Sequence, residues 1–259
     1  MPFATFAGEM RAIVILPSYN EAENVLQLST DVLSRDGVLD VVVVDDNSPD
    51  GTSDLVSGAM ADEPRLHLVK RPAKLGLGSA YQAGFEYALE NGYDLVFTMD
   101  CDYSHHPKHL PQFLESIAQG NDMVVGSRYV PGGGVRNWPI PRRLLSRFAN
   151  TYTRLLLRVP VHDCTAGYRC YTREVLETVD VSAIRSSGYA FLEDMVMRVH
   201  RAGFQIHEVP IIFEDRTRGA SKINHSEIYL AAWHVLKTAF YAPSVNKRVK
   251  AKPDTNSPR

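Results

Sequence analysis

The chain has 259 residues, of which 44% are hydrophobic and 22% charged, and its formal net charge is −2. This composition is ordinary for a globular protein large enough to bury one sizeable core. The near-neutral charge argues against a general nucleic-acid-binding protein. The three cysteines (Cys101, Cys164 and Cys170) form no CxxC pattern and indicate no disulfide framework.

Apolar segments alternate with helical patterns through the first half of the chain. The expected buried strands are 12–16, 41–44, 66–69, 95–99 and 123–125. The expected helices between them are 21–34, 52–60, 77–90 and 107–118. This alternation is typical of an α/β fold with a mostly parallel, Rossmann-like sheet, right-handed crossovers and helices on both faces.

The second half is less regular. A glycine-rich loop at 132–134 precedes an expected helix at 142–158, and 163–171 is expected to be a strand. Helices at 173–178 and 191–202, an extended segment at 205–214 and a helix at 227–241 follow. We expect an N-terminal extension over 1–10, one domain over 11–243 and a disordered basic tail over 244–259.

No segment of the sequence predicts a signal peptide or a spanning helix. The first ten residues lack a basic region followed by an apolar core. The best apolar candidate, 228–242, is interrupted by His234 and Lys237 and is shorter than the ~20 residues that a bilayer requires. We therefore expect a chain without transmembrane helices in a reducing cytosol.

Asp100 and Asp102 directly follow the expected strand 95–99. Alternate residues of a strand point the same way, so the two carboxylates are expected to project together from the carboxyl end of the sheet, where such folds bind ligands. Paired carboxylates there suit Mg²⁺ or Mn²⁺, which complete their coordination with phosphate oxygens and water. A solvated turn with two acids is the alternative.

Polar clusters also follow the first two expected strands, at 17–21 (PSYNE) and 45–51 (DDNSPDG). Adjacent strand ends of this kind form the crevice that holds nucleotides in open α/β sheets. A carboxylate there can accept from a base or a ribose hydroxyl, and Tyr19 can pack on a base. For Pro49 and Gly51, turn formation is a sufficient explanation.

Two further patterns do not indicate sites. The segment 74–79 (KLGLGS) is not a Rossmann fingerprint, because Tyr81 occupies the third glycine position and the loop follows the third strand. His105, His106 and His109 lack the partners of a zinc site, and Pro107 suits a helix start. We expect these histidines to be structural.

One segment is strongly basic. No acidic residue occurs between Met123 and His162, and seven arginines lie between Arg128 and Arg158. This distribution favours an anionic partner over a merely solvated helix face. An apolar stripe in the same segment predicts a basic amphipathic helix, which either packs on the core or lies in the headgroup region of a membrane. Its residues are Leu144, Leu145, Phe148, Tyr152 and Leu155.

Eight fragments occur in the order found in inverting nucleotide-sugar glycosyltransferases of the A-type fold. They are 17–21 (PSYNE), 45–51 (DDNSPDG), 100–107 (DCDYSHHP), 126–129 (GSRY), 163–169 (DCTAGYR), 188–191 (GYAF), 208–211 (EVPI) and 216–222 (RTRGASK). Within that family the chain most resembles the dolichol- or polyprenol-phosphate mannose synthases. The resemblance runs from about Ile13 to Ile223, and each fragment alone would be weak.

The resemblance implies roles for individual residues. It assigns nucleotide contacts to Pro17, Tyr19, Glu21 and Asp46, and diphosphate and metal contacts to Asp100 and Asp102. It assigns the handling of the phosphates to Arg128, Arg216 and Lys222, and places Arg142 and Arg143 in the acceptor loop. Ser104 stands where some relatives have Gln, which leaves the third metal ligand open. The chain has two adjacent acids, Glu193 and Asp194, and the resemblance leaves open which of them has the functional role.

The resemblance therefore implies an enzyme that transfers mannose with inversion from GDP-mannose to a polyprenyl monophosphate, using Mg²⁺ or Mn²⁺. A phosphate nucleophile is largely dianionic at neutral pH and needs no general base. The expected partners are these substrates, the membrane surface and, as a further option, a polytopic membrane protein. We expect no nucleic-acid partner. The expected location is cytoplasmic, peripheral on the inner face of the membrane.

Three alternatives stay open at this stage. The enzyme could transfer another sugar, such as glucose or GlcNAc, to polyprenyl phosphate. It could instead transfer a sugar to a polysaccharide hydroxyl, which would require Asp194 or Glu193 as a base. The non-enzyme alternative is an inactive subunit that binds a nucleotide or a lipid phosphate.

Overall fold

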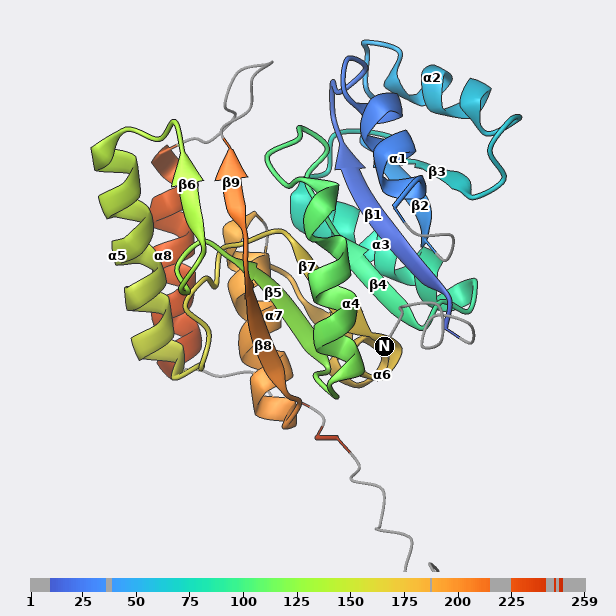
Figure 1. Ribbon diagram of the computed structural model, residues 1–259. Coiled ribbons are helices and arrows are strands. Elements are labelled where there is room, and N and C mark those ends of the chain that lie inside the picture. Colours follow the sequence, from blue (N-terminus) through green and yellow to red (C-terminus); the bar gives the residue numbers. More distant parts are fainter. Residues whose placement is uncertain are drawn as a thin grey trace, which may run out of the picture.

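Seven strands form one twisted sheet in the computed structural model, which describes residues 10–35, 39–186, 188–214, 225–240, 245, 247 and 248, with only the backbone for 225–231 (Figure 1). The strand order is β3-β2-β1-β4-β7-β5-β8. The strands are β1 (Ala12–Ser18), β2 (Leu39–Asp45), β3 (Leu66–Lys70), β4 (Leu95–Thr98), β5 (Met123–Ser127), β7 (Arg169–Thr172) and β8 (Ile206–Pro210). Only β7 is antiparallel to its neighbours, so the predicted mostly parallel α/β fold is confirmed.

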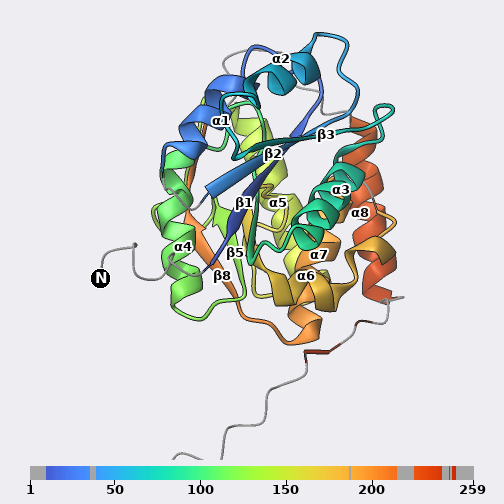
Figure 2. The same ribbon diagram turned by 90° about the vertical axis from the view of Figure 1, so that its right-hand side faces the viewer.

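Helices cover both faces of the sheet (Figures 1 and 2). They are α1 (Val25–Leu33), α2 (Thr52–Ala59), α3 (Leu77–Glu90), α4 (Leu110–Ala118), α5 (Ile140–Leu157), α6 (Arg173–Val179), α7 (Tyr189–Ala202) and α8 (His225–Phe240). Single 3₁₀ turns, η2 (Pro107–His109) and η3 (Val181–Ala183), precede α4 and follow α6. Helices α5 and α8 pack side by side at one end of the domain (Figure 1).

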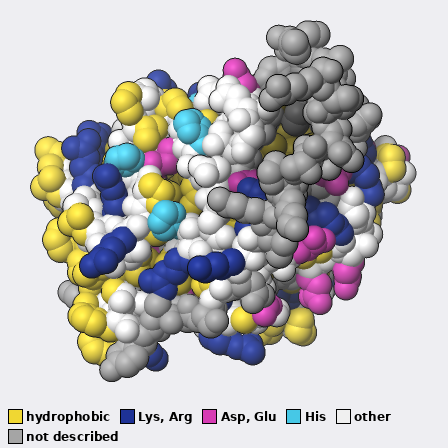
Figure 3. All heavy atoms as spheres, turned by 90° about the horizontal axis from the view of Figure 1, so that it is seen from below, with side chains coloured by type: hydrophobic (Ala, Val, Ile, Leu, Met, Phe, Trp, Pro, Cys, Tyr) yellow, Lys and Arg dark blue, Asp and Glu magenta, His cyan; other side chains and the backbone are white. Residues whose placement is uncertain are grey.

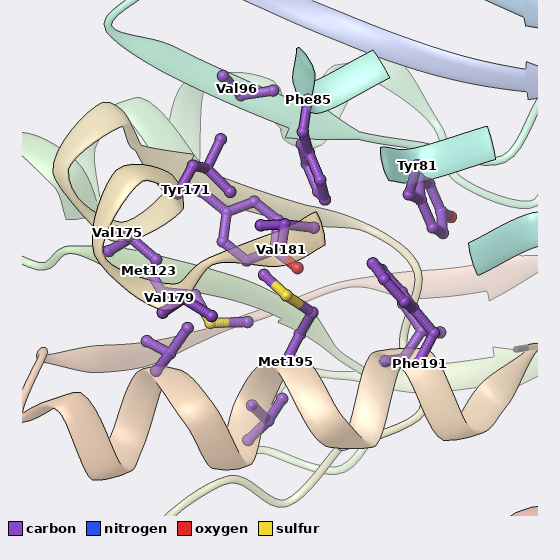
Figure 4. Close-up of a cluster of buried hydrophobic side chains, with 14 of the residues drawn as sticks. Tyr81, Phe85, Val96, Met123, Tyr171, Val175, Val179, Val181, Phe191 and Met195 are labelled. Atoms are coloured by element: carbon purple, nitrogen blue, oxygen red, sulfur yellow. The ribbon is translucent and has the colours of Figure 1, made fainter. Parts of the chain in front are cut away.

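Two apolar cores lie on opposite faces of the sheet, because successive strand residues point to opposite sides. In β1, Ile13 and Ile15 belong to the core beneath α3, α6 and α7, which Figure 4 shows in close-up. Val14 and Leu16 belong to the other core, which α1 and α4 cover. Fully apolar runs such as that of β2 follow from burial on both faces.

The second half departs from the sequence expectation in two places. The strand expected over 163–171 is confined to β7, because the residues before it form an irregular loop. The guanidinium of Arg169, fully buried, donates to the carbonyls of Cys164, Ala166 and Leu192 and holds that loop in place. The glycine-rich segment contributes β6 (Gly134–Arg136), which pairs in parallel with β9 (Ile212–Glu214) in a separate two-stranded sheet.

Arg248 lies in the segment that was expected to be disordered, and the structure places it against the domain. Its guanidinium pairs with Asp122 at 3.0 Å and with Glu174 at 2.8 Å, and its N–H donates to the carbonyl of Ala202. Across the described part of the chain, no helix is long and apolar enough to cross a membrane.

Candidate active site

The carboxyl ends of β2, β1 and β4 lie side by side, since β1 pairs with both of the other strands. The loops that leave these ends are the three polar segments singled out in the sequence. Ser18 is in register with Asp45, and their side chains share a hydrogen bond of 2.8 Å. The fold therefore gathers the predicted nucleotide and metal segments at one edge of the sheet.

Asp100 and Asp102 do not belong to a strand. β4 ends at Thr98, and the two carboxylates lie in a turn in which Tyr103 adopts a left-handed φ of 62°. The argument from strand alternation is therefore wrong, and the turn itself brings the acids to the edge. Asp102 Oδ1 accepts from the N–H of Ser104 at 3.0 Å, while the side chain of Asp100 is 36% exposed.

The donor set of this turn fits a hard divalent ion. Mg²⁺ and Mn²⁺ commonly take one or two carboxylates and keep water and phosphate oxygens in their other positions. The Oγ of Ser104, beside Asp102, is buried and has no hydrogen-bond partner among the described residues. The described residues contain no group of three or more acids, histidines or cysteines arranged to hold a metal, so a ligand phosphate would have to complete the site.

Asp100 is packed from three sides. Its N–H donates to Nδ1 of the buried His105 at 3.1 Å, and the hydroxyl of Tyr81 lies 3.5 Å from its Oδ1. A Cβ at Gly167 would approach that same Oδ1 to 3.2 Å. The predicted structural role of His105 fits this contact, whereas Tyr81 and Gly167 are site neighbours that the sequence did not reveal.

Two of the predicted nucleotide-binding residues, Asp46 and Tyr19, make contacts within the protein. Asp46 accepts from the N–H groups of Leu75 and Gly76 and pairs with Arg71 at 2.6 Å, so it fixes the loop after β3. The ammonium of Lys74, on that loop, lies 4.3 Å from the ring centre of Tyr19.

Pro17, Glu21 and Asp45 lie at the same edge of the sheet. Pro17, the last residue but one of β1, is in register with Val44, and Glu21 Oε2 accepts from Asn24 at 3.0 Å. Burial raises the pKa of Asp45, but hydrogen bonds from Ser48, Ser53 and Ser18 lower it more, so that its pKa lies below the ordinary value. Asp45 is therefore an anionic anchor beneath the crevice.

Arg128 forms a buried ion pair at the end of β5. Its Nε and Nη2 donate to Asp163 at 2.7 and 2.6 Å, and Nη2 also donates to Thr165 at 2.9 Å. Burial lowers the pKa of this guanidinium, but Asp163 more than offsets the effect and the net shift is upward. Glu208 on β8 accepts from the N–H of Asp163, which fixes the pair to the sheet.

Aromatic rings connect the surroundings of the acidic turn with those of the arginines. The ring of Phe213 on β9 lies 5.4 Å from His105 and also 5.4 Å from Trp138. The Cζ atoms of Arg142 and Arg128 lie 4.0 and 5.3 Å from the Trp138 ring centre. The structure therefore brings Arg128 and Arg142 to the same indole, and a chain of ring contacts joins that indole to His105.

The remaining predicted cations are placed less closely. Arg143, in the first turn of α5, is exposed. Arg216 and Lys222 lie outside the described residues. Phe213 and Trp138 carried no motif; the only signal that could have found Trp138 is its position just before a proline and two arginines.

Glu193 and Asp194, on α7, are both buried but differ in charge state. Burial raises the pKa of Glu193 to about 7, although its Oε1 accepts from Thr153 at 2.9 Å. Burial also raises the pKa of Asp194, but contacts with His234 and Arg198 lower it overall. Asp194 Oδ2 further accepts from Ser186 at 3.2 Å, so its oxygens are engaged within the protein.

The comparisons with known proteins agree with this geometry. Residues 13–180 match the model of glycosyl transferase family 2. A polyprenol monophosphomannose synthase of Mycolicibacterium smegmatis is 48% identical over 233 residues, covering 90% of this chain and 88% of that protein. An undecaprenyl-phosphate mannosyltransferase of Micrococcus luteus is 46% identical over 217 residues, covering 83% and 88%.

Solved structures support the fold. A glucosyl-3-phosphoglycerate synthase from Mycobacterium tuberculosis, in complex with Mn²⁺, UDP-glucose and phosphoglyceric acid, superposes with a TM-score of 0.66 at 18% identity. The match covers 93% of this chain and 83% of that chain. The fold and the match to the family model define an α/β protein of the glycosyltransferase class. The chain belongs to glycosyl transferase family 2 and is a glycosyltransferase.

The first prediction concerns the space above Asp100. The Gly167→Ala variant should displace the Asp100 carboxylate by a few tenths of an ångström, because the added methyl would lie 3.2 Å from both Asp100 Oδ1 and the Tyr81 hydroxyl. We expect metal-dependent nucleotide affinity to fall roughly tenfold, as for changes in groups that orient ligands. Calorimetric titration of nucleotide with Mn²⁺ checks this, with Gly58→Ala, where the added methyl meets nothing, as the control.

The second prediction concerns pH. Between pH 4.5 and about 7, folded Glu193 holds a proton that the unfolded chain releases, so the free energy of unfolding falls as pH rises across this interval. Glu193→Gln cannot ionise and escapes that fall. We therefore compare the Tm of the variant minus the Tm of the parent at two pH values. This difference should be more positive at pH 8 than at pH 5, by roughly 2–6 °C. A difference independent of pH would contradict the buried, raised-pKa carboxyl; exposed Glu86→Gln gives the baseline.

Proposed function

We propose that this glycosyltransferase transfers mannose, with inversion, from GDP-mannose to a polyprenyl monophosphate and so makes a lipid-linked mannose donor. The names of the two curated relatives support the sugar and the lipid phosphate. The observation that carries the proposal is the charge layout of the site. Two carboxylates suited to a metal–diphosphate lie in the turn that His105 contacts, and two arginines suited to a second phosphate lie beside Trp138. The ring of Phe213 contacts both His105 and Trp138.

The donor side would be formed by the segments at the ends of β1, β2 and β4. Pro17, Tyr19, Glu21 and Asp46 would shape the nucleotide pocket, Asp46 by fixing the loop that carries Lys74 over Tyr19. Asp100 and Asp102 would hold Mg²⁺ or Mn²⁺. When bound, the ion would stabilise negative charge on the leaving diphosphate. The Mn²⁺ in the structural neighbour supports a divalent ion without deciding between the two.

The acceptor side would be formed by arginines. A phosphate monoester has a second pKa near 6 and is largely dianionic at neutral pH, so it can attack without losing a proton to the enzyme. Two highly charged anions must nevertheless approach each other, and guanidinium groups offset that repulsion with bidentate hydrogen bonds. We propose Arg128 and Arg142 for this role because both guanidinium groups lie against Trp138. Arg143, Arg216 and Lys222 are proposed for it from the family resemblance.

The state of Asp194 supports a mechanism without a general base. A catalytic base works best with a pKa near the working pH, but the pKa of Asp194 is lowered and its oxygens face Ser186, Arg198 and His234. Glu193 has a raised pKa, but it is 3% exposed and bonded to Thr153. Both carboxyl groups are therefore buried, with Glu193 3% and Asp194 5% exposed, which disfavours access of a polysaccharide hydroxyl to either of them.

A lipid acceptor has to reach the site from a membrane, and the structure offers a suitable face. The stripe predicted on α5 is turned outward, with Leu144, Phe148 and Leu155 63–69% exposed. Trp233 and Phe240 on the neighbouring α8 are 67% and 76% exposed. Arg143, Arg147 and Arg154 of α5 are also exposed, and the left side of Figure 3 shows basic and hydrophobic side chains mixed on the surface. We therefore favour peripheral binding to an anionic inner leaflet over packing of this stripe on the core.

The metal assignment predicts that Asp102→Ala loses activity by more than the ~10–100-fold typical of changes in groups that only orient a ligand. The matched control is Asp54→Ala, an exposed acid in the first turn of α2. Transfer to a short-chain prenyl phosphate is measured at saturating donor while Mn²⁺ or Mg²⁺ is titrated. Near-native activity of Asp102→Ala would show that the metal site is misassigned.

The absence of a base predicts a particular pH profile. The rate should rise only while the acceptor loses its second proton, near pH 6, and then level off. Asp194→Asn and Glu193→Gln should cost on the order of tenfold at most, below the ~10²–10⁴ of a lost general base. Both variants are assayed from pH 5 to 9. A loss above a thousandfold in either, with fold and nucleotide binding intact, would favour the hydroxyl-acceptor mechanism.

The membrane proposal predicts that Phe148→Ser/Leu155→Ser weakens binding to anionic vesicles at least tenfold, because two exposed apolar side chains would no longer enter the bilayer interface. The control is Leu55→Ser/Met60→Ser, which removes exposed apolar side chains on and just after α2, away from this face. Flotation with phosphatidylglycerol vesicles measures binding. Equal losses in the two double variants would contradict a specific face.

A further inference from the structure

Trp138 is a buried residue with an unexplained polar atom. Its side chain is 7% exposed, and its indole Nε1 is buried without a hydrogen-bond partner among the described residues. A buried indole N–H usually has an acceptor, because leaving this donor unpaired costs free energy. No element of the reaction described above uses it. The orphan donor therefore leaves a hydrogen bond to be made with an acceptor outside the described residues.

Two guanidinium groups meet at this indole. The Cζ atoms of Arg142 and Arg128 lie 4.0 and 5.3 Å from its ring centre, within the ~6 Å range of cation–π attraction. Both cations are attracted to the indole, and this attraction offsets part of the repulsion between like charges. One aromatic residue thus holds together two cations that come from different elements, Arg128 after β5 and Arg142 in α5.

The surroundings fix Trp138 firmly. It follows β6, whose pairing with β9 is reinforced by the Arg136–Glu214 ion pair at 2.9 Å, and it packs edge-on against Phe213. Pro139 then begins α5, an 18-residue helix without an acidic residue in its first turn. The positive end of the helix dipole therefore adds to the charge of the arginines beside Trp138.

Arg128 keeps donors for a further acceptor. Its bonds to Asp163 and Thr165 use Nε and Nη2, which leaves the Nη1 edge of the fork. We propose that Trp138 organises a phosphate-binding site, in which its indole holds the guanidinium groups of Arg128 and Arg142 side by side and its Nε1–H is an additional donor. The ligand is the phosphate monoester of the acceptor, an assignment that rests on the proposed function.

The acceptor monophosphate fits this site better than the donor diphosphate. The carboxylates suited to a metal-bound diphosphate lie in the turn next to His105, whereas both guanidinium groups lie against Trp138. Trp138 instead leads within two residues to Ile140, which is 70% exposed and begins the outward apolar stripe of α5. A phosphate at Trp138 would leave its prenyl chain next to an apolar surface.

Tryptophan fluorescence tests the proposal without turnover. The chain has two tryptophans, so Trp233→Phe leaves Trp138 as its only indole, and Trp138→Phe leaves the exposed Trp233 as the matched control. Geranyl phosphate, geraniol, inorganic phosphate and GDP with Mn²⁺ are titrated into each. We expect a saturable change in Trp138 emission with geranyl phosphate, a weaker one with inorganic phosphate and none with geraniol. GDP with Mn²⁺ should leave that emission largely unchanged.

Binding and kinetics of two substitutions separate the roles of the ring and the N–H. Trp138→Leu removes both and should raise the Kd for geranyl phosphate roughly ten- to thirtyfold, whereas Trp138→Phe keeps a ring and should raise it less. Both should raise the KM for the prenyl phosphate more than they lower kcat. The Kd for GDP with Mn²⁺, which also reports correct folding, should stay within about twofold.

Two results would overturn the proposal. One is unchanged Trp138 emission in a protein that binds geranyl phosphate by equilibrium dialysis. The other is an emission change caused by GDP with Mn²⁺ alone, which would place the site on the donor side. A protein that binds geranyl phosphate at Trp138 but transfers no mannose would instead refute the proposed sugar and leave the phosphate site in place.

Discussion

The buried ion pair between Arg128 and Asp163 is the interaction on which the site depends. Both side chains are removed from water, so each charge is tolerable only because the other neutralises it through two short hydrogen bonds. Glu208 on β8 accepts from the backbone N–H of Asp163 and so holds it to the sheet. Arg128 lies against the ring of Phe213, which also contacts His105 of the acidic turn. Removal of either partner would leave the other charge buried and unpaired. It would also shift Arg128 and its surroundings relative to Asp100 and Asp102.

The two proposed sides of the site carry charges of opposite sign, with acids in the turn after β4 and arginines beside Trp138. His105, which contacts Asp100, and Phe213, against which Arg128 lies, have ring centres 5.4 Å apart. The arginine side is continuous with α5 and α8, whose exposed apolar side chains suit a bilayer surface. Under the proposed function, this arrangement would let a lipid phosphate approach from the membrane while the nucleotide enters over the sheet edge, without a base between them.

The sequence predicted the sheet because hydrophobic periodicity decides which segments are buried on both faces, and the first five strands carry that signal clearly. It predicted α3 at its observed bounds, 77–90, for the same reason. Chain-order reasoning could not place β7 between β4 and β5, since only tertiary pairing decides that position. Asp100 and Asp102 were found for a wrong geometrical reason, because a left-handed residue at Tyr103 leaves no trace in hydrophobic pattern. No sequence pattern indicates Trp138 or Phe213, because they meet only through the pairing of β6 with β9, which the sequence does not predict.

Product formation from competing donors tests the central claim most directly. The protein, with anionic vesicles containing a polyprenyl phosphate and with Mn²⁺ or Mg²⁺, is given radiolabelled GDP-mannose, UDP-glucose or UDP-GlcNAc in turn. The account predicts label in the lipid fraction from GDP-mannose, as a mild-acid-labile phosphodiester of β configuration, and little from the other donors. Label in a polysaccharide fraction, or preferential transfer from a UDP-sugar, would contradict it.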